Sequence, residues 1–235
     1  MLETDPCVER HRDTMIREIL TRIYELLYDA FGPQNWWPSE TSFEVIAGAI
    51  LTQNTNWTNV EKAIANLKSA ECLSPQGLRH IELARLAELI RPAGYYNLKS
   101  RRLKNFVDWL FDNYVGEVEN LRSVDTDRLR TELLTVKGVG RETADSILLY
   151  ALDRPVFVVD AYTARIAIRH GLIEPDAGYE QLRELFEWNL PRNIELFNEY
   201  HALLVRAGKE FCKTKARCPG CPLEELPHTL EIEDF

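Results

Sequence analysis

The spacing of apolar residues constrains the fold of this chain most, because nearly every long segment has helical rather than alternating periodicity. Two clear apolar stripes are Ile16, Leu20, Ile23 and Leu27, and Phe43, Ile46, Ala47, Ile50 and Leu51. Further helices are expected over residues 60–67, 83–90, 100–114, 127–134, 141–151, 161–170, 179–190 and 194–208. Val156–Val159 is the one strand-like run and is too isolated to build a sheet. The sequence therefore predicts an all-α protein.

The composition is that of an ordinary globular protein. The chain has 235 residues, of which 45% are hydrophobic and 28% charged, enough for one large core or two small ones. Its apolar runs fall short of the roughly 20 residues of a membrane span, and the N-terminus lacks the apolar core of a signal peptide. We therefore expect a cytoplasmic protein with no membrane partner.

Residues 134–144 read Leu-Thr-Val-Lys-Gly-Val-Gly-Arg-Glu-Thr-Ala, which predicts a tight hairpin between two helices. Asp125, Thr126 and Asp127 are suitable N-caps for the first helix. Glycines on either side of one apolar residue can take positive φ, so the chain can reverse with little bulk. The amides at the start of the second helix, together with its positive end, then form an anion site that suits one DNA phosphate. On the glycines alone, a plain turn is an equal alternative. The candidate DNA-binding residues here are Lys137, Gly138, Val139, Gly140, Arg141 and Thr143.

The charges are unevenly distributed. A formal net charge of −9 argues against general nucleic-acid affinity, because counterion release needs local positive charge. Two groups of basic residues could nevertheless offer DNA one basic face, the alternative being solvated helix faces. These groups are Arg91, Lys99, Arg101, Arg102 and Lys104, and Lys137, Arg141, Arg165 and Arg169.

A single acid, Asp160, follows the apolar run Val156–Val159 and stands directly before an expected helix. Such a position fits a plain N-cap. It also fits a functional carboxylate. The break at Pro155 separates the segment that carries Asp160 from the hairpin helices, so the two can belong to different lobes. A groove between two helical lobes at that break would present hairpin and acid to one substrate.

The hairpin, the following aspartate and the cysteines near the C-terminus resemble the endonuclease III branch of the helix-hairpin-helix DNA glycosylases. Further landmarks are Leu-Thr-Gln-Asn-Thr at residues 51–55 and Ala-Gly-Tyr-Tyr-Asn-Leu-Lys at residues 93–99, so the resemblance runs from about Trp36 to Cys221. It implies two α-helical lobes with a DNA-binding cleft. One is a six-helix lobe over residues 39–154 that ends in the hairpin. The other joins residues 1–38 to residues 155–235.

The resemblance also implies an activity. Members of the family flip a damaged base out of double-stranded DNA and cut its N-glycosidic bond, and flipping is easier for a damaged base. By motif position, Gln53 should fill the gap left by the base and Tyr95 should wedge the opposite strand; the alternatives are a helix cap for Gln53 and buried packing for Tyr95. Asp160 matches the catalytic aspartate, which stabilises positive charge on the sugar or orients water. We expect a monomer.

One departure from the family pattern bears on the reaction. In the lyase members, a lysine directly after Gly-Val-Gly-Arg forms a Schiff base with the sugar, whereas this chain has Glu142. A carboxylate cannot form an imine, and Lys137 lies on the far side of the hairpin. The sequence therefore predicts a monofunctional glycosylase without AP-lyase activity.

Aromatic residues suggest the substrate. Trp36, Trp37 and Pro38 precede the first family helix and Trp57 follows Gln-Asn-Thr, as in the bacterial subgroup that removes 3-methyladenine. Alkylation makes the purine cationic, and indoles attract such a base by roughly 0.5 to 2 kcal/mol per contact. The alternative is that these are ordinary core aromatics. Lys209 matches a pocket lysine that can carry a carbamate in this subgroup, although a solvated lysine would fit too. The subgroup implies the bacterial cytosol and nucleoid.

Three of the five cysteines are bunched at Cys212, Cys218 and Cys221, which in a reducing compartment suggests metal rather than disulfides. Much of the family binds a four-iron four-sulfur cluster through four cysteines, but here the fourth position is Pro227. Three thiolates leave such a cluster incomplete. His228 or Cys7 could complete it, or the motif is a relic. We expect no other cofactor.

Two alternative functions remain open at this point. One is removal of uracil or thymine from mismatches, or of oxidised pyrimidines, as in endonuclease III itself. The other is a non-catalytic protein that binds DNA structures through the hairpin alone. The main prediction is a base excision repair enzyme acting on 3-methyladenine.

Overall fold

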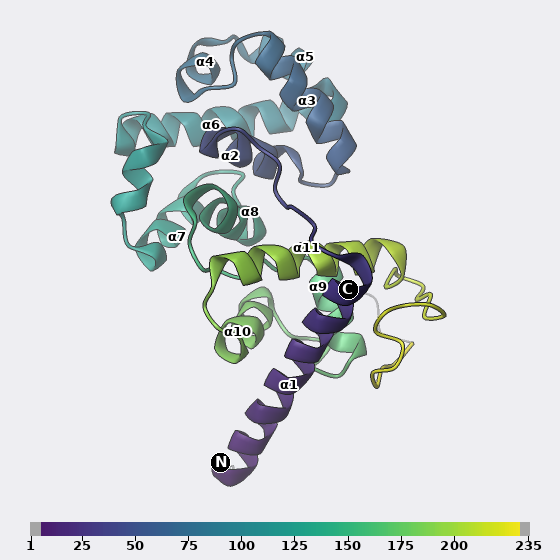
Figure 1. The fold of residues 1–235 in the computed structure, drawn as a ribbon. Helices are drawn as coiled ribbons and strands as arrows, with labels where there is room; N and C mark the ends of the chain where they lie inside the picture. The colour runs from purple at the N-terminus through teal and green to yellow at the C-terminus, as the bar shows by residue number, and fades with distance from the viewer. Residues whose placement is uncertain (1–5, 231–235) are drawn as a thin grey trace. The chain divides into compact units, whose positions relative to one another are not determined.

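The computed structural model describes residues 6–230, with side chains from residue 14 onward (Figure 1). Over these residues the regular elements are all helical, which confirms the predicted all-α class. The chain divides into two compact units, which we call the central lobe (Trp37–Arg154) and the terminal lobe (the residues up to Trp36 and those from Pro155). The first boundary falls two residues earlier than the sequence predicts, because Trp37 packs with the central lobe.

The central lobe is built around α6 (Tyr96–Tyr114), which α2, α4 and α5 contact. Its buried stripe, Leu103, Phe106, Val107 and Leu110, has the spacing expected of a helix facing a core. The other elements of this lobe are α2 (Ser42–Leu51), α3 (Trp57–Ser69), α4 (Pro75–His80), α5 (Leu83–Leu89), η1 (Arg91–Ala93), η2 (Val118–Ser123), α7 (Thr126–Thr135), α8 (Arg141–Ser146) and η3 (Ile147–Ala151).

Helices α7 and α8 enclose the predicted hairpin. Asp125 caps α7 by accepting the amides of Asp127 and Arg128, both at 3.1 Å. Arg130 on α7 donates Nε to the fully buried carboxylate of Asp145 on α8 at 2.6 Å, and Nη2 to its other oxygen at 3.0 Å. Because this paired contact fixes both distance and orientation, it holds the two helices at one geometry.

Two of the α-helices differ from the sequence prediction. Residues 141–151 were expected to form one α-helix, but α8 passes at Ile147 into a π-helical turn, η3. The short helix α4 was not expected, because its six residues bury one side chain, Leu78, and show no periodicity. Ser74 starts it by accepting the amide of Gly77 at 2.9 Å.

The terminal lobe contains α1 (Pro6–Phe31), α9 (Ala161–Arg169), α10 (Tyr179–Asn189) and α11 (Ile194–Glu210). Residues 156–159 are extended and buried, and form no strand. Within this run Phe157 stacks on Phe186 at 4.2 Å between ring centroids. The hydroxyl of Tyr200 donates to the carbonyl of Leu20 at 2.8 Å, which ties α11 to α1. No helix among the described residues is long and apolar enough to cross a membrane.

Helices α9 and α11 pack closely at Gly208. A Cβ atom at this position would lie 2.4 Å from Cδ1 of Tyr162 on α9. Only glycine therefore allows the two backbones to approach this far. This close packing brings side chains from two distant parts of the sequence together at the start of α9.

Candidate DNA-binding and catalytic site

The hairpin between α7 and α8 has the tight geometry that the glycines predict. Gly138 has φ +102°, and a Cβ there would lie 2.3 Å from Cγ of Arg102, so glycine is required on both grounds. Val139 is 6% exposed and anchors the turn in the core, whereas Lys137, Gly140 and Arg141 are exposed. The first amides of a helix have no partner within it, so the exposed start of α8 suits an anion.

Gln53 is bound to the hairpin. Its Nε2 donates to the carbonyl of Gly138 at 3.1 Å and to the hydroxyl of Thr143 at 2.8 Å. Its Oε1 accepts from Arg102 of α6. The side chain therefore does not cap a helix, which was the alternative interpretation; Thr52 is the C-cap of α2. Thr143 is buried, so its hydroxyl orients Gln53 rather than facing solvent.

Tyr95 projects from the loop between η1 and α6. Its side chain is 68% exposed, so the alternative of buried packing is wrong. The backbone has φ +45° and ψ +30°, a left-handed conformation that tyrosine seldom adopts. Such conformations persist when the surroundings impose them, and they are frequent in ligand-binding segments.

Two members of the expected basic face are buried instead. Lys99 is 1% exposed and Arg169 is 3% exposed. Arg169 donates to the carbonyls of Lys213 and Thr214, both at 2.7 Å, and so holds the loop after α11. Lys99 and Arg169 are buried because a helix that packs on a core buries one face, including any charged residues on that face. Arg91 and Arg101 are exposed, as expected.

Two of the predicted pocket tryptophans meet in the central lobe. Trp37 and Trp57 pack edge to face, with ring centroids 4.8 Å apart at 86°. Tyr150, from the π-helical turn, joins them with its ring centroid 5.3 Å from that of Trp37. The Nε1 of Trp57 donates to Oε1 of Glu61 at 2.9 Å. We call the three aromatic residues Trp37, Trp57 and Tyr150, together with Glu61, the aromatic cluster.

The structure gives less support for the other predicted pocket residues. Trp36 belongs to the terminal lobe and Pro38 is exposed. Lys209 is exposed near the end of α11 in the terminal lobe. Burial is what favours carbamate formation on lysine, so its proposed modification has no support from its surroundings.

Asp160 is the N-cap of α9, and its two oxygens have different environments. Oδ1 accepts the amide of Thr163 at 2.8 Å and the hydroxyl of Thr163 at 3.0 Å. Oδ2 faces His201 of α11, with 3.8 Å between Oδ2 and Nε2. Burial acts to raise the pKa of this carboxyl, but His201 and the two bonds from Thr163 outweigh it and lower the pKa below 3.8. The carboxylate is therefore ionised at neutral pH, and capping uses only one oxygen.

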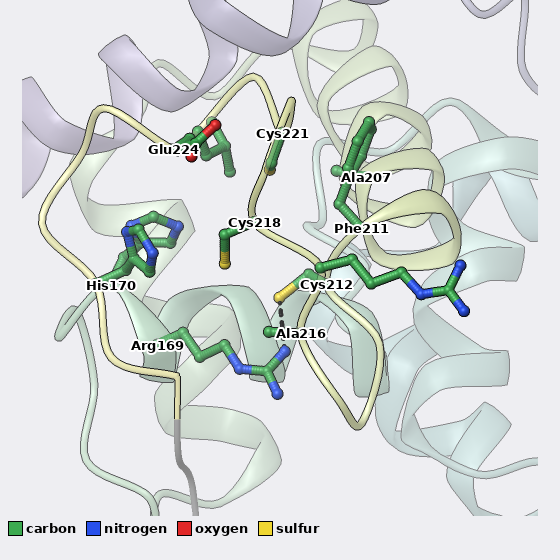
Figure 2. Close-up of a pocket in the computed structure, with 12 residues that line it drawn as sticks. Arg169, His170, Ala207, Phe211, Cys212, Ala216, Cys218, Cys221 and Glu224 are labelled. Carbon is green, nitrogen blue, oxygen red and sulfur yellow. Dashed lines mark hydrogen bonds between the residues drawn. The ribbon is translucent and has the colours of Figure 1, made fainter.

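The three clustered cysteines line one pocket of the terminal lobe with His170 and His228 (Figure 2). Cys212 accepts from Nη1 of Arg169 at 3.1 Å, and burial raises the pKa of Cys221. Among the described residues, no three donors are arranged to hold a single metal ion. A four-iron four-sulfur cluster needs four ligands, and the three thiols of this pocket with His228 or Cys7 remain the predicted set. The side chain of Cys7 lies outside the described residues.

Sequence reasoning missed Tyr150 and His201. Tyr150 lies in a segment expected to be regular α-helix, and in the structure it lies in the π-helical turn and contacts Trp37. His201 lies on the buried face of α11, where the sequence pattern indicates only a residue of the core. No local pattern links either residue to its partner, because the contacts depend on how helices pack.

Comparisons with known proteins agree with this geometry. Residues 47–192 match the family described as HhH-GPD superfamily base excision DNA repair protein. A putative DNA repair glycosylase of Methanocaldococcus jannaschii is 53% identical over 211 residues, covering 89% of this chain and 96% of the relative.

Solved structures give the same result. The 3-methyladenine DNA glycosylase MagIII of H. pylori, bound to 1,N6-ethenoadenine, is 31% identical with a TM-score of 0.71, covering 83% of this chain and 97% of that chain. An endonuclease III bound non-covalently to DNA is 25% identical with a TM-score of 0.76, covering 92% and 94%. The match to the family model spans more than half of the chain and includes the hairpin between α7 and α8 and Asp160. The chain therefore belongs to the HhH-GPD superfamily of base excision DNA repair glycosylases.

Proposed function

We propose that this DNA repair glycosylase is monofunctional and removes alkylated purines such as 3-methyladenine from double-stranded DNA. The observation that carries the proposal is the aromatic cluster, in which the faces and edges of Trp37, Trp57 and Tyr150 meet beside the carboxylate of Glu61. Aromatic faces and a nearby carboxylate both attract a cation. An alkylated purine is cationic and uracil is neutral, so this surface favours the purine. The structural likeness to MagIII supports the same substrate class.

Asp160 is the proposed catalytic residue. As the N-glycosidic bond breaks, its electron pair leaves with the base and positive charge develops on the sugar. A carboxylate that is ionised at neutral pH stabilises this charge or orients the water that attacks the sugar carbon. Water supplies the hydroxyl, and its proton is lost. A cationic base is already a good leaving group, so one carboxylate suffices.

Glu142 supports a reaction that stops at base removal. It lies exposed in the first turn of α8, at the position where the lyase members have their lysine. Strand cleavage by β-elimination through an imine requires a primary amine, which a carboxylate cannot replace. We therefore expect purified protein to release base without nicking DNA and to form no covalent adduct on borohydride reduction. Nicking at the rate of base release, with a trapped adduct, would overturn this part of the proposal.

The substrate is tested with duplexes carrying 3-methyladenine, 7-methylguanine, uracil or thymine glycol. We expect release of 3-methyladenine to have the highest kcat/KM, measured by chromatography of the free base. Trp57→Ala should lower that value about tenfold, consistent with a desolvated cation–π contact. Trp109→Ala is the matched control, because Trp109 packs on Phe106 and Tyr114 in the same lobe but outside the cluster. Faster release of uracil than of 3-methyladenine would contradict the proposal.

A further inference from the structure

Lys99 is a buried lysine in the core of the central lobe. It is 1% exposed, and its Nζ donates to the carbonyl of Leu51 at 2.9 Å and to the carbonyl of Ala93 at 2.7 Å. Burial, and then the charge of Arg102, lower the pKa of this lysine to about 8. Burying an ammonium group is costly, so a lysine here needs a structural or functional reason. A neutral amine and an ammonium both have at least two hydrogens, so either form can make both bonds.

The two carbonyls belong to the two segments that bear the expected DNA-inserting residues. Leu51 is the last residue of α2 and stands two positions before Gln53. Ala93 is the last residue of η1 and stands two positions before Tyr95. A carbonyl at the end of a helix has no partner in that helix, so Lys99 satisfies two such groups at once. One side chain thereby fixes the distance between the two segments.

Both segments also have strained backbones. Asn54, next to Gln53, has φ +54°, and Tyr95 has φ +45°. Left-handed conformations at residues other than glycine are seldom populated unless neighbouring contacts hold them. The bonds from Lys99 lie within three residues of each strained position. They are therefore well placed to keep both segments in these conformations.

Lys99 belongs to a polar stripe on α6 that continues to the hairpin. Arg102, one turn later, donates to Oε1 of Gln53, and Cγ of Arg102 lies beneath Gly138. Asn105, a further turn along, donates Nδ2 to the carbonyl of Lys137 at 2.8 Å. Residues at i, i+3 and i+6 lie along one side of a helix. The stripe thus contacts in turn the Gln53 segment, the Tyr95 segment and the hairpin.

We propose that Lys99 is a positioning residue that holds the Gln53 and Tyr95 segments at the spacing required to insert both side chains into duplex DNA. This inference rests on the DNA-inserting roles of Gln53 and Tyr95 in the proposed function, but not on the identity of the damaged base. Lys99 acts through backbone carbonyls and touches no substrate.

Lys99→Met tests this directly, because methionine retains much of the side-chain volume and loses the donors. Lys104→Met is a matched control on the same helix. Lys104 also donates Nζ to two carbonyls, those of Arg79 at 2.9 Å and Ile81 at 2.6 Å, but these belong to the C-terminal end of α4. The readout is the ratio of affinities for a duplex with a stable abasic analogue and for the same duplex intact. An abasic analogue leaves the gap that Gln53 would fill, at no flipping cost.

Lys99→Met is expected to reduce that ratio about tenfold, and Lys104→Met to leave it within twofold. A ratio does not depend on the fraction of folded protein, so lower stability alone leaves it unchanged. If Lys99→Met cannot be purified, Lys99→Gln takes its place. Glutamine retains one donor group, so this variant should reduce the ratio by less than tenfold but by more than Lys104→Met does. A ratio unchanged in the Lys99 variant, or reduced equally by both variants, would overturn the inference. Because binding is measured and not base release, failure of the proposed substrate leaves this test intact.

Discussion

The two carboxylate oxygens of Asp160 have different surroundings. Oδ1 is engaged by Thr163 as the cap of α9, and Oδ2 faces His201. Sequence could place the acid at a helix start, because the N-cap position and the hairpin before it are local features. It could not supply His201, which lies 41 positions later (201 minus 160) on a face that reads as core. That contact depends on the close approach of α9 and α11.

If Asp160 is the catalytic residue, its contact with His201 should set the acid limit of base release. The pKa of Asp160 is lowered, so the stability that its carboxylate contributes is complete above the ordinary pKa of an aspartate and is lost as pH falls through the lowered value. In His201→Asn the histidine contact that lowers the pKa of Asp160 is lost and the effect of burial remains, so the pKa of Asp160 should rise. We expect the acid limb of single-turnover base release, corrected for spontaneous loss, to move to higher pH. His80→Asn, an exposed histidine of the other lobe, should leave the limb in place.

At the scale of elements, the hairpin is where sequence and structure agree best. Two glycines, an N-cap and apolar spacing are short-range signals, and each specifies one local geometry. Other elements lacked such signals. The π-helical turn after α8 has no signal in the sequence, and α4 has too few residues to show a period. The burial of Lys99 was likewise not visible in the sequence, because a charged residue is normally solvated.

The two hairpin glycines give an internal comparison. Gly138→Ala requires alanine at φ +102° and places Cβ 2.3 Å from Arg102, so it should lower the free energy of unfolding by more than about 1 kcal/mol. Gly140→Ala meets no atom within 4 Å and has φ −94°, so it should lose only the preference for glycine at the N-cap of α8 and cost less than Gly138→Ala. Urea unfolding of both variants provides the measurement. Equal losses of stability would contradict the assignment of Gly138 as the strained position.

At the scale of the whole molecule, the chain forms a continuous central lobe and a terminal lobe assembled from both ends. The break at Pro155 marks one boundary in the sequence. The other boundary is not visible locally, because Trp36 and Trp37 are adjacent and belong to different lobes. Pairing of α1 with α11 joins residues as distant as Leu20 and Tyr200, and only the family resemblance predicted that the two ends share one lobe.

The central claim, that this molecule cleaves a glycosidic bond with Asp160, is tested most directly by Asp160→Asn. Asparagine caps helices about as well as aspartate, so the Thr163 contacts and the fold should survive. Base release and duplex binding are measured in parallel on the substrate that the wild-type protein processes best. We predict a loss of base release of at least about 100-fold with binding unchanged within threefold. Base release that persists within a few-fold of the wild-type rate would contradict it.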